Sequence, residues 1–172
     1  MEVIKIWLLC VFAAMAYGVV HDQITVRVCL EYFSVFHPTI LPLTSPTLLA
    51  LQWGIVATWW VGGALGVPLA IAARAGSQPT LSARDLRQPL LILLACMAAA
   101  SLAAGTTGFL LTRARIISLR EWMAAMLPAT QHARFMADWW AHSASYLVGI
   151  VGGLIVCIHT YSKRGRIPSP VA

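Results

Sequence analysis

The stretch that decides the fold is WAHSASYLVGIVGGLIVCIHTY, residues 140–161, which contains no aspartate, glutamate, lysine or arginine. A helix needs about 20 predominantly apolar residues to cross a bilayer. Three further stretches are long and apolar enough, at about residues 3–20, 48–73 and 89–112. The sequence therefore predicts an all-α fold, in which a bundle of four transmembrane helices forms one integral membrane domain over residues 1–172.

Composition excludes the other classes of protein. Of the 172 residues, 59% are hydrophobic and only 10% are charged, whereas an average soluble domain is about 45–50% apolar and about 25% charged. The formal net charge of +6 comes mainly from short segments between apolar runs, which suits topology setting and contact with anionic lipid headgroups. We therefore predict the lipid bilayer, and no nucleic acid, as the partner of these residues.

The first apolar stretch also resembles a signal peptide, because Ala14-Met15-Ala16 offers an A-x-A-like cleavage site. Against cleavage, Glu2 stands in the region that is normally basic, and the apolar pattern continues past the site. We favour a retained helix. Three of the four cysteines lie inside apolar runs, which excludes a disulfide framework and favours small buried residues. The cysteines are Cys10, Cys29, Cys96 and Cys157.

Basic residues bias the segments that carry them toward the cytoplasm. With the N-terminus inside, the inner segments carry Lys5, Arg74, Arg84, Arg87, Lys163, Arg164 and Arg166. The outer segments carry Arg27, Arg113, Arg115, Arg120 and Arg134. This asymmetry predicts that both termini are cytoplasmic in a bacterial inner membrane, with the basic tail after residue 162 as the strongest anchor.

Two segments, 21–46 and 113–140, then emerge together on the outer face. Alternation of apolar and polar side chains over residues 24–31 predicts a strand, with a short interfacial helix as the alternative. Three prolines that follow, at positions 38, 42 and 46, exclude a regular helix and indicate extended chain. The apolar pattern of residues 116–126 predicts an amphipathic helix in the membrane interface.

Small residues recur at four-residue spacing inside the spans and predict close packing between helices. They are Gly62 and Gly66, Ser101 and Gly105, and Ser145, Gly149 and Gly153.

The outer segments also hold most of the chemistry of the chain. Histidine and carboxylate together suit Zn, Fe or Mn, and also Cu. Asp138 and His142 stand four apart and share a helix face, so they can reach one metal, and His21-Asp22 can complete the site. We predict these four residues as metal ligands. The candidate ligand-binding residues beside them are Glu31, His37 and His132.

Haem is a second interpretation, since His21 and His142 stand at the outer ends of two helices, where two imidazoles can ligate one iron. The structural alternative assigns each residue a local role: histidines cap helices or bind carbonyls, and carboxylates form ordinary salt bridges. Those pairs would be Asp138 with Arg134 and Glu31 with Arg27.

Three stretches resemble a group of small, uncharacterised bacterial integral membrane proteins. They are AYGVVHDQITVRVCLEYFSVFHP at residues 16–38, SPTLLA at 45–50 with the tryptophan-rich span after it, and FMADWWAHSASYLVG at 135–149. The resemblance implies a bacterial membrane protein with several spans and assigns no role to any residue. The favoured hypothesis is a membrane protein with an outer site for a metal, cofactor or small ligand. The alternatives are a structural or assembly subunit of a larger complex, or of a homo-oligomer, and a membrane enzyme.

Overall fold

The computed structural model describes residues 1–166, and its regular structure over these residues is entirely helical. The elements are α1 (Glu2–Val28), α2 (Leu30–Ser34), α3 (Pro46–Val56), α4 (Trp59–Arg74), α5 (Arg87–Arg113), α6 (Glu121–Ala124), the 3-10 turn η1 (Ala129–Gln131) and α7 (His132–Arg164). Four helical segments are long and apolar enough to cross a membrane: α1, α3 with α4, α5, and η1 with α7. The predicted all-α, four-span architecture is confirmed.

The strand predicted over residues 24–31 is wrong, because α1 continues to Val28 and α2 follows after a single residue. Asp22, Thr25, Val26 and Cys29 are all buried. Asp22, Thr25 and Val26 have helical spacing, so they form one face of α1 that packs on the rest of the bundle. Tertiary burial of this face thus overrides the two-residue alternation that the local sequence shows.

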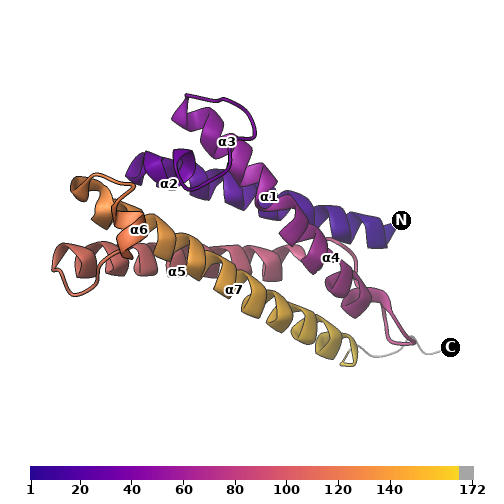
Figure 1. Ribbon diagram of the computed structural model, residues 1–172. Coiled ribbons are helices and arrows are strands. Elements are labelled where there is room, and N and C mark those ends of the chain that lie inside the picture. Colours follow the sequence, from indigo (N-terminus) through magenta and orange to yellow (C-terminus); the bar gives the residue numbers. More distant parts are fainter. Residues whose placement is uncertain (167–172) are drawn as a thin grey trace.

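The two predicted outer segments meet at one end of the molecule, as the threading requires. Leu119, Met123 and Leu127 of the second segment pack on Cys29 of the first and on Phe135 of α7. The predicted amphipathic helix of residues 116–126 is reduced to the single turn of α6. Figure 1 shows α2 and α6 at this end, and the N-terminus with the end of α7 at the other.

The second span is broken between α3 and α4, where Thr58 Oγ1 donates a hydrogen bond to the carbonyl of Gly54. Both halves contact α1, and in Figure 1 they follow one another across it. The contact is close: a Cβ on Gly62 would stand 2.5 Å from the Cys10 carbonyl oxygen, and one on Gly54 would stand 2.5 Å from Val19 Cα. These glycines therefore let the backbones touch, as the predicted packing requires.

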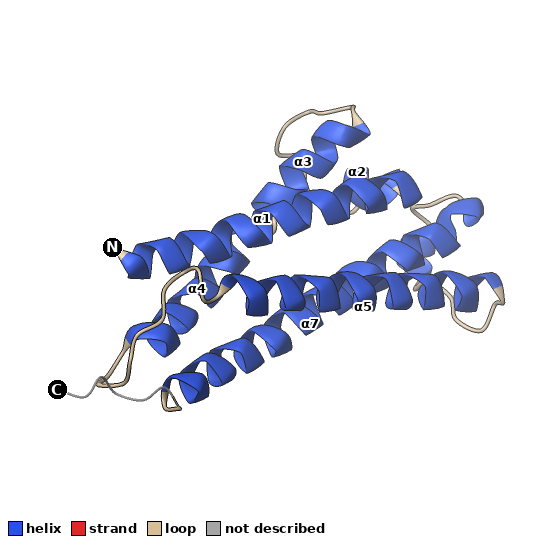
Figure 2. Cartoon of the chain, turned by 180° about the vertical axis from the view of Figure 1, so that it is seen from behind, coloured by secondary structure: helices blue, strands red, loops and turns tan. Residues whose placement is uncertain are grey.

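The other pair consists of α5 and α7, which lie side by side along most of α5 in Figure 2. A Cβ on Gly108 would meet the Met136 carbonyl oxygen at 2.9 Å, so this contact too depends on the absence of a side chain. Helices α1, α3 and α4 form one group, and it contacts the α5–α7 pair chiefly between α4 and α7. The second half of α1 faces α7 across a space that polar side chains occupy.

At the opposite end, Arg164 of α7 is completely buried. Its guanidinium donates to the carbonyls of Ala72 (2.8 Å), Ala75 (2.9 Å), Gln78 (3.0 Å) and Pro79 (2.8 Å). Helix ends leave such carbonyls without partners, so Arg164 ties the end of α7 to the end of α4. It is a structural clamp rather than the exposed anchor that the basic tail suggested.

Candidate metal centre

Three of the four predicted metal ligands come together at the end of the bundle that holds α2 and α6. His21 and Asp22 stand on the last third of α1, and His142 stands opposite them on the first half of α7. One ligand atom from each lies within 4.8 Å of the other two. The imidazole rings of His21 and His142 approach edge to face, with centroids 4.5 Å apart.

The hydrogen bonds of His142 identify which of its nitrogens is free. Nδ1 lies 2.8 Å from the backbone carbonyl oxygen of Asp138, and a carbonyl only accepts, so Nδ1 carries a proton. In a neutral imidazole, Nε2 then presents its lone pair. That atom faces Asp22 Oδ1 at 3.2 Å. Two acceptors in such contact require either a shared proton or a metal ion between them.

His21 follows the same pattern from the other side. The Ser101 hydroxyl donates to the Ala141 carbonyl at 3.1 Å, so its oxygen can accept from His21 Nδ1, 3.4 Å away. His21 Nε2 is then the acceptor nitrogen, and it is buried without a hydrogen-bond partner. Metal-binding histidines almost always donate their other ring N–H in this way, which fixes the ring orientation.

Aromatic and hydroxyl groups enclose the cluster. The Tyr32 ring stacks on His142, with centroids 4.6 Å apart, and the Tyr17 ring stacks on His21 at 5.7 Å. One turn nearer the middle of the bundle, the Tyr17 and Ser145 hydroxyls share a hydrogen bond of 2.7 Å. Asp22 and His142 are only 5% and 9% exposed. A charge pair here is therefore removed from bulk water.

The fourth predicted ligand, Asp138, stands next to this group but outside it. His142 contacts the backbone carbonyl of Asp138 rather than its carboxylate. The Asp138 side chain is 1% exposed, and its Oδ2 has no hydrogen-bond partner. Coordination of one metal by the carboxylate of Asp138 and by His142, as the four-residue spacing suggested, is not the arrangement that the structure shows.

The three predicted ligand-binding residues are spread over the same end of the molecule. Glu31 accepts a hydrogen bond from the Cys29 thiol at 3.5 Å, and burial raises the pKa of that thiol to about 12. His37 Nδ1 donates to the Tyr32 carbonyl at 2.7 Å. Burial lowers the pKa of His37, so the neutral ring is favoured. His132 Nε2 contacts the Leu127 carbonyl at 3.2 Å, the local role that the structural alternative assigns.

The salt bridges of that alternative are absent from the described part of the chain. Arg27 bonds to Gln23 and Thr47 instead of Glu31, and the ion pairs among residues 1–166 are Lys5 with Glu2 and His142 with Asp22. Haem ligation between His21 and His142 does not fit either. With ring centroids only 4.5 Å apart, there is no room for a porphyrin plane between the two imidazoles.

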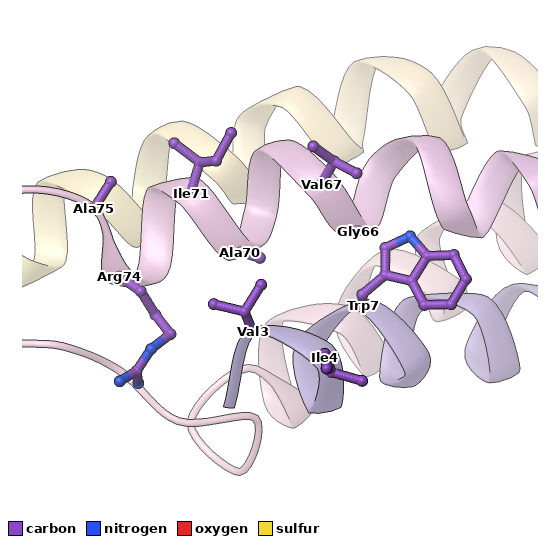
Figure 3. A pocket seen from close by; sticks show the side chains of 9 residues that line it. All are labelled: Val3, Ile4, Trp7, Gly66, Val67, Ala70, Ile71, Arg74 and Ala75. Atoms are coloured by element: carbon purple, nitrogen blue, oxygen red, sulfur yellow. The ribbon is translucent and has the colours of Figure 1, made fainter. Parts of the chain in front are cut away.

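A cavity of about 360 Å³ borders the cluster and extends between the helices toward the opposite end. His21, Asp22 and His142 line one part of it, and His37 also reaches it. A second hollow, a groove of about 400 Å³ between α1 and α4, lies elsewhere. Figure 3 shows its walls, which are apolar except for Arg74 at one end, so it offers no comparable set of ligand atoms.

Sequence reasoning missed the residues that support the cluster. Tyr17 precedes His21 by one helical turn, and Ser145 follows His142 by nearly one turn, so both share a face with a ligand. The sequence predicts Ser101 as a small packing residue, and Ser145 as one that also continues the helix face of Asp138 and His142. Helical spacing from each histidine was the available signal, whereas the contact of Ser101 with His21 is tertiary and has no local signature.

No family model, no curated protein and no solved structure matches this chain. The functional argument therefore depends on the geometry of this site.

Proposed function

We propose that the protein is an integral membrane metalloprotein that binds one divalent transition metal between His21 Nε2, Asp22 and His142 Nε2. One observation carries the proposal: one ligand atom from each of His21, Asp22 and His142 lies within 4.8 Å of the other two, and Nδ1 of each histidine has a hydrogen-bond partner. Two histidines and one carboxylate are a donor set that zinc and non-haem iron use, with further positions left open for small molecules.

The site is further proposed to face the outside of a bacterial inner membrane, with both termini in the cytoplasm. The excess of basic residues at the end that holds Met1 and Arg166 supports this orientation. A reporter fusion at residue 172 tests it: activity of a cytoplasmic reporter is expected, and activity of an extracytoplasmic reporter would reverse the threading.

Metal binding is tested on protein purified in a mild detergent without chelator. Elemental analysis should find about one divalent metal per chain. The proposed protein ligands of this metal are Asp22 and two imidazoles. His21→Ala and His142→Ala should each lose the metal. His159→Ala is the matched control, because His159 is exposed and lies on the same helix as His142; it should retain the metal. Equal retention in all three variants would remove the site from this cluster.

A further inference from the structure

The residues that line the cavity beside the metal centre extend along much of α1 and α7. On α7 its lining runs from His142 to Leu154, and on α1 from Asp22 to Cys10. Each interval spans about 18 Å at 1.5 Å per residue. If the volume of about 360 Å³ is spread evenly over this length, the mean cross-sectional area is about 20 Å², which suits one extended hydrocarbon chain better than a fused ring system.

Polarity is unequal along its length. The cluster residues, with Tyr17 and Ser145, supply polar atoms at the outer end, whereas Leu90, Leu93 and Leu154 line the part toward the inner end. Lipid tails are as apolar as these walls, so moving a chain from the bilayer into the cavity gains little by itself. Selection of a ligand must therefore come from its headgroup at the metal.

The charge of the centre indicates which headgroup. A divalent metal with one carboxylate and two neutral imidazoles carries a net charge of +1, in surroundings that exclude bulk water. A buried charge is stable only when it is paired, and a carboxylate headgroup supplies both the missing charge and an oxygen ligand. Asp138 is not among the residues that line the cavity, so a ligand can approach the centre from the cavity side.

We propose that the cavity binds a single-chain amphiphile of the fatty-acid type, with its carboxylate on the metal and its chain between the four spans; this inference depends on the proposed metal-binding function. The ligand enters from the bilayer that surrounds the protein, and the metal holds its headgroup at the outer end of the bundle.

The test uses the full-length protein loaded with Co²⁺ in a maltoside detergent, which has no carboxylate that could bind the metal. The visible absorption spectrum of bound Co²⁺ depends on its ligands. Adding laurate should therefore change the spectrum until the binding site is saturated. Acetate at the same concentration should not, because it has the headgroup without the chain.

Ala13→Leu tests the chain end of the cavity. Ala13 lines it two helical turns from His21, at about 12 Å along α1, so the larger side chain fills space without touching the metal. The variant should bind Co²⁺ as wild type does but bind laurate at least about tenfold more weakly. Ala16→Leu, on the exposed face of the same helix, is the control and should match wild type.

Three results would count against the proposal, and they are distinguishable. Failure of wild type to bind Co²⁺ would remove the metal site and the ligand together. A Co²⁺ spectrum that laurate leaves unchanged would refute only the ligand. An equal response to acetate, or a normal laurate response in Ala13→Leu, would refute the role of the cavity as the site of the chain.

Discussion

Asp22→Asn separates a metal centre from an ordinary His142–Asp22 ion pair. The substitution removes one negative charge and keeps the size of the side chain. Without metal we expect the free energy of unfolding to change by less than about 1 kcal/mol. The reason is that the new amide can donate to His142 Nε2, which now lies 3.2 Å from the Asp22 carboxylate.

With metal the two proteins should differ strongly. At a metal concentration about 100 times its dissociation constant, binding stabilises wild type by about 2.7 kcal/mol. A chain of this size gains about 2–4 °C in Tm per kcal/mol, so Tm should rise by roughly 5–11 °C on these constants. Loss of residues that merely orient ligands weakens binding about 10–100-fold. Loss of Asp22 itself should therefore cost at least about 100-fold, leaving a gain of about 0.4 kcal/mol and a rise of about 1 °C.

The assay is thermal unfolding in detergent, followed by tryptophan fluorescence, with chelator and then at one fixed metal concentration. Glu121→Gln is the matched control, since it removes an exposed negative charge at the same end of the molecule, and it should keep the full rise. The reasoning is refuted if Asp22→Asn shows the same metal-dependent rise as wild type.

Three further substitutions test the surroundings of the site and the fold. Ser101→Ala removes the partner of His21 Nδ1 and should weaken metal binding about tenfold in a competition titration, with the Tm of the metal-free protein nearly unchanged. Arg164→Met removes four hydrogen bonds to carbonyls and should lower the free energy of unfolding by about 3 kcal/mol, measured by denaturant titration; a loss below about 1 kcal/mol would show that those carbonyls find other partners. Burial lowers the pKa of His37 in the folded protein, so the unfolded chain takes up this proton at a higher pH than the folded protein does. The stability of metal-free protein should therefore fall as pH drops below about 6.5. His37→Phe should reduce this slope in pH-dependent unfolding, and an unchanged slope would assign it to other groups.

The sequence sufficed for the features that depend on composition and on length. Long apolar runs have one stable form in a bilayer, so the four spans and the shared end of the two outer segments followed from counting. The extension of α1 to Val28 did not follow, because it depends on burial of Asp22, Thr25 and Val26 against other parts of the chain. The break at Thr58 was equally invisible, since it depends on where α1 crosses Gly54.

The same distinction, between what the sequence pattern predicts and what tertiary contacts decide, applies to the candidate site. Residue type and topology placed His21, Asp22 and His142 on one face, which was enough to propose them as a set. Spacing also favoured Asp138, whose position four residues before His142 is equally consistent with a backbone contact, and the structure shows that contact. Which nitrogen of each histidine is free depends on hydrogen-bond partners in other elements or in the backbone, so no sequence pattern predicts it.

X-ray absorption spectroscopy of the metal bound to wild-type protein tests the central claim most directly. For zinc, two imidazole nitrogens at about 2.0–2.1 Å are expected, with the remaining ligands oxygen. Sulfur at about 2.3 Å would place the metal on cysteines and contradict the account, as would protein that binds no divalent metal when it is supplied.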